Sequence, residues 1–305
     1  MKLNALLKTL GFLALAATPA VAGTAPAPKN PVAPAPVNDD LGLNASIGYD
    51  TNYIWRGLNY GQHWVRAGVG GSILLLGGAS EDGAGNTSLN WDAQFGTLFG
   101  DQDHFVSGAG RGEASFQRLQ LGAAVVHDFG PASLSLGYRY YRNTGLLTQS
   151  NAVAGFNGMN DGQEVSLGVA TALGPIDLAS SVNYDFVNNY WYFDMNASTT
   201  IAVTDSFSIV PFANIGYGKN MNWQWNAFSL LGTNASNNIT GWTALTTGIN
   251  FPIKLNSRAT LTPYIAVNVP LGATHNMGAN ALAAGLPDTP YQSVLYGGVT
   301  LSVRF

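Results

Sequence analysis

The sequence predicts an all-β fold: a closed antiparallel transmembrane β-barrel of about twelve strands, with short turns at one end and long loops at the other. Three observations lead to this prediction. Apolar and polar residues alternate along many segments of about ten residues, the first and last segments are long two-faced strands, and the connections are alternately short and long. Pairing the first strand with the last removes the two exposed edges that an open sheet would leave.

The first expected strand is 41–56. Its apolar face ends in Tyr53 and Trp55, and its other face is small and polar and carries Asp50 and Arg56. We expect the apolar face to meet lipid and the polar face to line the interior of the barrel.

The last expected strand is 291–305, in which residues such as Leu301 alternate with residues such as Ser302. It ends in Phe305. A terminal aromatic at the membrane rim resembles the signal that barrel-assembly machinery reads. Phe305 is therefore the candidate assembly signal, and this machinery is a candidate partner.

Ten further segments show the same alternation, with large apolar residues on one face and mostly Gly, Ser, Ala, Asn or Thr on the other. They are 63–76, 89–96, 118–125, 134–141, 164–173, 177–186, 191–201, 207–219, 243–251 and 261–269. Each fits the segment of roughly ten residues expected of an outer-membrane barrel.

The connections provide an independent check. If both termini are periplasmic, the connections after the even-numbered strands must be periplasmic and short. Four of these five are tight, including Gly130-Pro131 and Gly174-Pro175, and 77–86 is the exception. The long loops fall on the other side. Within this scheme Pro211 and Pro263 lie inside strands, where a proline removes a hydrogen-bond donor, so we expect β-bulges at both positions.

The N-terminus carries Lys2 and Lys8, an apolar run and then Ala20-Val21-Ala22, which is typical of a secretory signal peptide. An Ala/Pro-rich segment follows that cannot form a packed core. The expected organisation is a signal peptide over 1–22, a periplasmic spacer over 23–40 and the barrel over 41–305.

Composition excludes several classes of function. The formal net charge is −4, and it becomes more negative without the signal peptide, which argues against a nucleic-acid partner. The absence of cysteine excludes disulfides and thiolate metal sites. Only 10% of the residues are charged while 46% are hydrophobic, as expected where half of each strand faces lipid. A soluble β-sandwich or jelly roll would explain the alternation, but not the signal peptide, the outer aromatics and the loop asymmetry together.

The stretch YDTNYIWRG, from Tyr49 to Gly57, resembles the motif that opens the first hairpin of the TorF-type porin family of Gram-negative outer membranes. Asn52, Tyr53, Ile54, Arg56 and Gly57 fall on the pattern. Thr51-Asn52 stands where the family has serine-aspartate. The resemblance implies a barrel in the bacterial outer membrane, in contact with its lipid and lipopolysaccharide.

No motif for enzyme chemistry stands out. Gly108 to Gly112 lies in an expected loop without the strand-to-helix context of a phosphate cradle. A lipid-modifying enzyme would need a Ser and a His on the lipid-facing rim, and four scattered histidines give no metal-ligand spacing. The four histidines are His63, His104, His127 and His275. We expect neither an enzyme nor a cofactor nor a metal.

The informative residues are the charged ones expected to point inward, because charge is tolerated inside a barrel but not toward lipid. They either form a rigid lattice of salt bridges or set ion selectivity. They are Arg56, Arg66, Arg118, Arg139, Asp50, Asp92, Glu164, Asp185 and Asp194.

We expect Arg56 and Arg66 to form a local positive site near the extracellular mouth, offset by Asp50 and Asp92. A barrel of about twelve strands has a backbone radius of roughly 12 Å, more than small side chains can fill. The sequence therefore predicts a porin-like channel for passive diffusion of small hydrophilic solutes or ions. The alternatives are a non-conducting structural or adhesion barrel and, third, an outer-membrane lipid-modifying enzyme.

Overall fold

The computed structural model describes residues 42–77, 85–99, 116–144, 161–222, 238–272, 274–276 and 292–305. The expected signal peptide (1–22) and spacer (23–40) lie outside these residues. Within the described residues, the chain forms no helix with the length and apolarity needed to cross a membrane.

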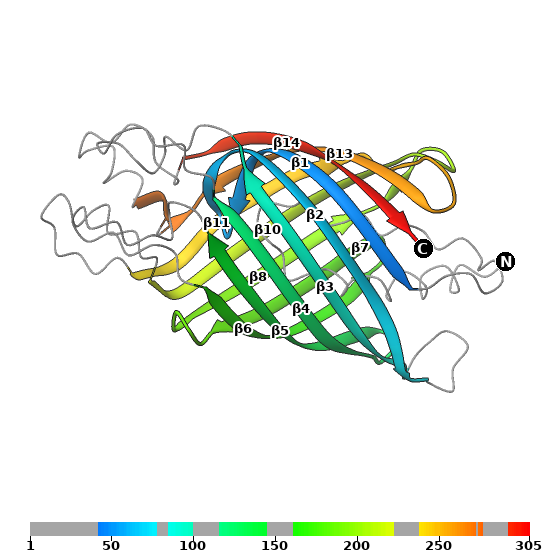
Figure 1. The fold of residues 1–305 in the computed structure, drawn as a ribbon, viewed down its shortest axis with the longest axis horizontal. Helices are drawn as coiled ribbons and strands as arrows, with labels where there is room; N and C mark the ends of the chain where they lie inside the picture. Colours follow the sequence, from blue (N-terminus) through cyan, green and yellow to red (C-terminus); the bar gives the residue numbers. More distant parts are fainter. Residues whose placement is uncertain are drawn as a thin grey trace, which may run out of the picture.

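Fourteen strands form one antiparallel sheet in this part of the chain, and twelve of them close into a barrel of strongly tilted strands (Figure 1). The other two, β9 and β12, are two residues long and pair with β10 and β13. The predicted closed barrel is confirmed. The strands are β1 (Leu43–Trp55), β2 (Leu58–Leu76), β3 (Thr87–Leu98), β4 (Gln117–Asp128), β5 (Ala132–Thr144), β6 (Gly162–Leu173), β7 (Ile176–Asp185), β8 (Tyr190–Thr199), β9 (Ile201–Ala202), β10 (Ser208–Asn222), β11 (Asn238–Asn250), β12 (Ile253–Lys254), β13 (Ala259–Pro270) and β14 (Val294–Arg304).

The barrel closes where the first strand meets the last. β1 and β14 pair in register from Asn44 opposite Arg304 to Asp50 opposite Gly298. Beyond this ladder the Phe305 amide donates a hydrogen bond to the carbonyl oxygen of Leu43, at 2.9 Å. In the part of the chain that the structure describes, no long unpaired end strand remains, which is the arrangement that the two terminal segments predicted.

The two ends of the barrel differ in their connections. We call the end where β1 begins and β14 ends the terminal end, and the opposite end the loop end. At the terminal end, Gly130 and Gly174 form the two Gly-Pro turns with φ of 89° and 62°, angles that glycine adopts without a Cβ penalty. At the loop end the connections after β3, β5, β10 and β13 are long, and they lie mainly outside the described residues.

The exterior is apolar. Side chains such as Ile47, Leu136 and Leu167 are 56%, 64% and 54% exposed, and they alternate along their strands with buried or part-buried inward residues. An apolar exterior with a polar interior is the pattern of a barrel that is surrounded by lipid.

Aromatic rings follow one another across the exterior near the loop end, from β5 to β11. Their ring centroids lie between 4.6 and 6.5 Å apart. Rings in this position are typical of the girdle at a membrane interface. This aromatic belt consists of Tyr138, Tyr184, Phe186, Trp191, Phe193, Tyr217 and Trp242.

The expectation of bulges at Pro211 and Pro263 is wrong. Pro211 lies opposite Ile249 and Pro263 lies opposite Val299, with no register shift at either pair. Instead, a neighbouring strand is interrupted beside each proline. The partner of β10 changes there from β8 to β9, and the partner of β13 changes from β11 to β12. A strand break beside the proline accommodates the missing donor without an extra residue.

Candidate functional site inside the barrel

The hairpin of β1 and β2 leaves the wall and folds into the barrel. β1 pairs with β14 only as far as Asp50, and β2 begins to pair with β3 only at Trp64. Between these points, Asn52 lies opposite Gln62 and the two strands pair only with each other. We call residues 53–61 the inner tip. Among the described residues, the inner tip therefore forms a short two-stranded ribbon that has no strand neighbour on either edge.

The backbone shows where the ribbon bends. The register shifts between Tyr53 and Ile54, and on the returning strand Gly61 and His63 have φ of 146° and 58°. Register shifts in antiparallel pairs bend the strands and increase their twist. These features lie at the base of the inner tip, where the hairpin turns from the wall toward the interior.

The inner tip ends in a two-residue turn formed by Arg56 and Gly57. Their φ angles are 52° and 82°, as a type I′ hairpin turn requires at both central positions. The side-chain amide of Asn268 on β13 donates to the Gly57 carbonyl oxygen at 3.0 Å. A Cβ built on Gly57 would lie 2.5 Å from the Cβ of Ala244 on β11. The turn therefore contacts the wall at β11 and β13.

Two sequence expectations fail in this hairpin. Tyr53 and Trp55 were expected to face lipid, yet they are 0% and 5% exposed inside the barrel. The expected strands 41–56 and 63–76 leave 57–62 as their connection, yet Leu58 and the residues after it belong to β2. Both differences have one cause. The two strands continue as a ribbon after they leave the wall, and both faces of that ribbon lie in the interior.

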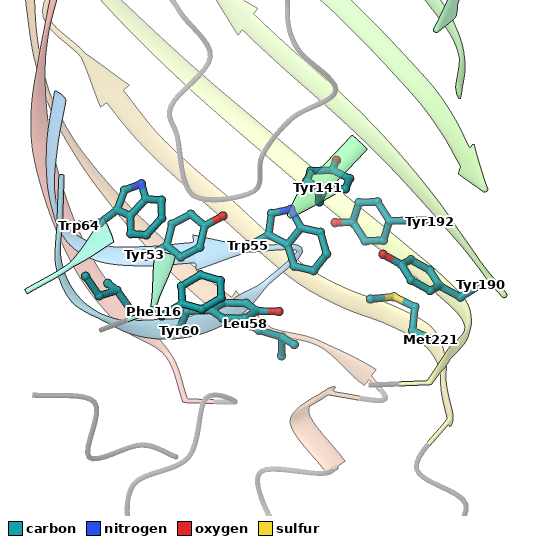
Figure 2. Close-up of a cluster of buried hydrophobic side chains, with 11 residues drawn as sticks. Tyr53, Trp55, Leu58, Tyr60, Trp64, Phe116, Tyr141, Tyr190, Tyr192 and Met221 are labelled. Carbon is teal, nitrogen blue, oxygen red and sulfur yellow. The ribbon is translucent and has the colours of Figure 1, made fainter. Parts of the chain in front are cut away.

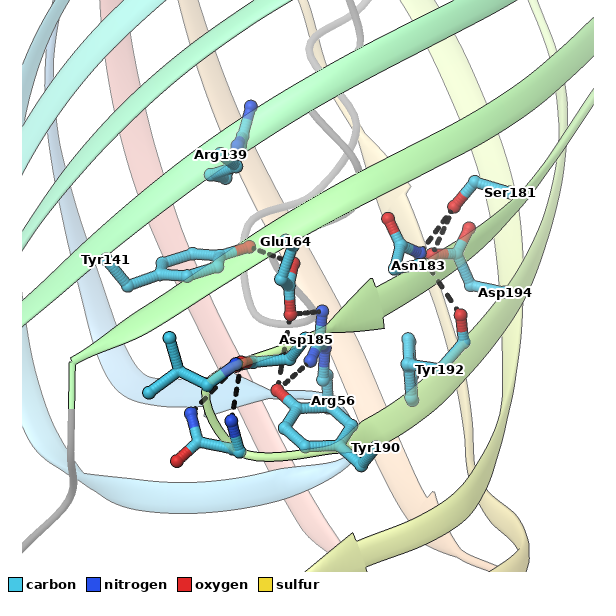
Figure 3. Close-up of polar contacts among 12 residues, drawn as sticks. Arg56, Arg139, Tyr141, Glu164, Ser181, Asn183, Asp185, Tyr190, Tyr192 and Asp194 are labelled. Atoms are coloured by element: carbon cyan, nitrogen blue, oxygen red, sulfur yellow. Dashed lines mark hydrogen bonds and ion pairs between the residues drawn. The ribbon is translucent and has the colours of Figure 1, made fainter.

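Arg56 is held by a buried carboxylate. Its Nη2 lies 2.5 Å from Oε1 of Glu164 on β6, and its Nη1 donates to the hydroxyl of Tyr190 on β8. The Tyr190 hydroxyl donates to the same carboxylate oxygen at 3.2 Å, and the Tyr141 hydroxyl donates to Oε2 at 2.9 Å. Figure 3 shows these groups converging from three wall strands on the inserted guanidinium. Each oxygen of Glu164 thus accepts at least one hydrogen bond.

Aromatic rings surround the same guanidinium. Its Cζ lies 4.6 Å from the ring centroid of Trp55, 5.2 Å from that of Tyr190 and 4.6 Å from that of Tyr192. Distances below about 6 Å fall within the range of cation–π attraction, which is strongest where water is excluded. Arg56 therefore sits in an aromatic cage that is closed on one side by a carboxylate.

Arg118 on β4 is bound differently. Its Nε donates to Oδ1 of Asn143 at 2.7 Å, and its Nη1 donates to the Tyr53 hydroxyl at 2.8 Å. Five rings lie within 6 Å of its Cζ, the nearest being Trp55 at 4.2 Å. No carboxylate in the described part of the chain forms an ion pair with it, so rings and neutral oxygens offset its charge.

A cluster of buried aromatic and apolar side chains packs around one face of the inner tip (Figure 2). Tyr53 stacks on Trp64 with centroids 4.1 Å apart, and Trp55 meets Tyr141 edge to face at 5.9 Å. The members come from the tip, β2, β3, β5, β8 and β10 and from Phe116, directly before β4. They are Tyr53, Trp55, Leu58, Tyr60, Trp64, Leu98, Phe116, Tyr141, Tyr190, Tyr192 and Met221.

The opposite face of the inner tip packs against the remaining wall. Ile54 is fully buried in a second cluster with Phe212, Tyr264, Ala266 and Tyr296, which lie on β10, β13 and β14. Between them, the two clusters and the contacts of Arg56, Gly57 and Arg118 involve every barrel strand of the described chain except β7. The inner tip therefore fills the cross-section of the barrel near the loop end.

Two further arginines pair with carboxylates on the wall. Arg66 Nε lies 3.1 Å from Asp50 Oδ2, and the other oxygen of Asp50 accepts a 2.7 Å hydrogen bond from Tyr264. Arg139 Nη2 lies 2.9 Å from Asp92 Oδ1. Asp50 offsets Arg66 as expected, but the expected common positive site of Arg56 and Arg66 is wrong, and Asp92 pairs with Arg139 instead. Each of the two has a carboxylate partner of its own, because Arg56 is carried across the barrel on the inner tip.

The other two inward carboxylates hold neutral partners. Asp185 accepts hydrogen bonds from the amides of Val187 and Asn188 and so caps the turn between β7 and β8. Asp194 accepts a hydrogen bond from the Ser181 hydroxyl at 3.1 Å, as Figure 3 shows. All nine charged residues singled out from the sequence thus lie on the interior side. The aromatic residues that bind Arg56 and Arg118 were not among the predicted site residues.

No family model matches the sequence, and no curated protein matches it. Among solved structures, the barrel is similar to the KdgM porin, with 9% sequence identity over 86% of this chain and 99% of that chain and a TM-score of 0.44. An outer membrane channel from Pseudomonas putida F1 gives 10% identity over 90% and 100% of the two chains, with a TM-score of 0.47. LpxR from Salmonella typhimurium gives 9% identity over 86% and 100%, also with a TM-score of 0.47. At these values the function has to be argued from the residues of this chain.

Proposed function

We propose that this protein is an outer-membrane channel for small hydrophilic solutes, closed at its loop end by the inner tip. The observation that carries the proposal is the polar interior between the inner tip and the terminal end. The inward positions there are mostly small or polar, with Val126 and Val210 as apolar exceptions, and many of them are only part-buried. Examples are Ser46, Asn90, Gln94, Asn196, Ser198, Thr300 and Ser302.

Barrel size supports the same reading. Twelve tilted strands enclose a backbone radius of roughly 12 Å, and short side chains leave most of such a width to water. A barrel built only for rigidity would gain more from large apolar residues at these positions. Large residues occur instead near the loop end, where the inner tip lies.

The exterior supports the membrane location. An apolar surface interrupted by the aromatic belt matches a barrel that is surrounded by lipid. We assign the terminal end to the periplasm and the loop end to the cell surface, where the belt would meet lipopolysaccharide. Phe305, 46% exposed beside Leu43, stays our predicted signal for the barrel-assembly machinery.

The test is the conductance of purified protein in a planar bilayer, with and without the inner tip. Asn52 lies opposite Gln62, so replacing 53–61 by an Asn-Gly turn keeps the register of the hairpin. We expect the full chain to be closed most of the time and the shortened variant to conduct steadily. Heat-modifiable migration on a gel shows whether each barrel is folded. A folded shortened variant without conductance would refute the channel.

The second candidate is a non-conducting structural barrel. The observation in its favour is the complete burial of the inner tip, whose residues Tyr53, Ile54 and Tyr60 are 0% exposed. Such packing could serve rigidity alone. The same experiment separates the two candidates, because a structural barrel would lose thermal stability on shortening without gaining a current.

A further inference from the structure

The groups that hold Arg56 form a binding site on the wall. Glu164 supplies the carboxylate, the Tyr141 and Tyr190 hydroxyls donate to it, and the rings of Tyr190 and Tyr192 flank the guanidinium. These residues lie on β5, β6 and β8, and none of them belongs to the hairpin that carries Arg56. We call Tyr141, Glu164, Tyr190 and Tyr192 the cation site.

The chemistry of the cation site suits an organic cation. A guanidinium or ammonium group forms a charge-assisted hydrogen bond with a carboxylate, and it is attracted to the faces of aromatic rings. Glu164 is 1% exposed, so without a cation it would be a buried charge with only two hydroxyls as donors. A neutral solute would not compensate that charge.

The occupant of the cation site, Arg56, lies on a segment that is not paired with the strands of the wall. The inner tip pairs only with itself, so its withdrawal breaks no strand pairing of the wall. One hydrogen bond to its backbone comes from a wall side chain, from Asn268 to Gly57. What holds it otherwise is the contact of Arg56 with the cation site, the contacts of Arg118 with Tyr53 and neighbouring rings of the tip, and the packing of its side chains.

We propose that the cation site binds solutes that carry a guanidinium or alkylammonium group, that Arg56 occupies it as a tethered ligand, and that such a solute displaces Arg56 and releases the inner tip. The inference names the solute class and the opening step of the proposed channel, and so it rests on the proposed function. In the closed protein, the Arg56 guanidinium takes the position of the solute cation.

The direct test empties the site and refills it. In the variant Arg56→Ala, Glu164 keeps its cage but loses its cation. Methylguanidinium matches the group that was removed, and methylurea is its neutral counterpart. We expect methylguanidinium to raise the Tm of Arg56→Ala in a saturable manner, because a ligand that binds only the folded state stabilises it. Methylurea should leave the Tm unchanged.

Two matched controls identify the carboxylate. The double variant Arg56→Ala with Glu164→Gln should show no response to methylguanidinium. Arg258→Ala, which removes an exposed arginine at the turn between β12 and β13, should show none either. Equal shifts with methylguanidinium and methylurea, or equal shifts in the control variants, would overturn the proposal.

The variant with the shortened tip gives a second measurement if Arg56→Ala does not fold. There the cation site faces the open interior, so methylguanidinium should reduce the potassium current, and Glu164→Gln in the same variant should abolish this block. A current that methylguanidinium leaves unchanged would refute the cation site while the channel stands. A saturable Tm shift without any current would keep the site and refute the channel.

Discussion

Glu164 and Asp92 are both inward carboxylates paired with an arginine, yet their surroundings differ. The side chain of Glu164 is 1% exposed beneath the inner tip, whereas that of Asp92, farther from the loop end, is 25% exposed. In the loop-end half, aromatic rings exclude water and each charge depends on a specific partner. In the terminal half, short polar residues leave room for water, which also stabilises the charges.

The comparison shows how one alternating pattern yields two kinds of interior. Inward positions are mostly polar or small in the terminal half, whereas the loop-end half has large inward wall residues such as Tyr141 and Tyr192 and also receives the inner tip. Side-chain size, rather than polarity, decides which half is closed. The predictions below test this contrast, from the largest expected effect to the smallest.

The largest effect is expected from removing one carboxylate in each half. Glu164→Gln leaves the Arg56 guanidinium buried without its counter-charge, which costs about 3–5 kcal/mol of folding free energy. Asp92→Asn removes the counter-charge of Arg139, which is 5% exposed, but residue 92 is itself 25% exposed and water can enter there, so the loss should be smaller, about 1–3 kcal/mol. Thermal unfolding followed by heat-modifiable migration measures both. Equal losses of folding free energy would show that water is excluded equally from the two halves.

Glycines in the loop-end half test the tightness of its packing. A Cβ on Gly96 would lie 2.0 Å from the ring of Trp64, and Gly77, at the terminal end of β2, has nothing within 4 Å. Gly96→Ala should therefore cost about 1–3 kcal/mol through overpacking. Gly77→Ala is the matched control and should change the Tm little. If Gly96→Ala were as stable as the control, Trp64 would have room to move.

The architecture could be predicted from the sequence because strand alternation is local. A period of two marks a strand whose faces meet different environments, and all twelve barrel strands meet lipid on one side. The closure of the first strand on the last also followed, because an open edge in such a chain is unfavourable. Alternation does not show where a neighbouring strand is interrupted. The strand breaks beside Pro211 and Pro263 were therefore not predicted.

The inner tip could not be predicted in the same way. Alternation assigns Tyr53 and Trp55 to the lipid face only while β1 stays in the wall, and the bend at Tyr53 and Gly61 removes that condition. One local signal was present: two residues ending in glycine between alternating runs predict a tight hairpin turn. The pairing of Arg56 with Glu164 needs the register across the whole barrel, which no local pattern contains.

The last prediction concerns which half faces the outside, and it changes labelling rather than stability. The chain has no cysteine, so a single introduced thiol is the only one present. Val187 lies in the loop-end turn between β7 and β8 and is 45% exposed, and Ser257 is exposed in the terminal-end turn between β12 and β13. On intact cells, a membrane-impermeant maleimide should label Val187→Cys and leave Ser257→Cys unlabelled until the outer membrane is permeabilised. Both variants should keep the wild-type Tm, since neither side chain is packed. The reverse labelling would place the inner tip on the periplasmic side, and the cation site would then be reached from within the cell envelope.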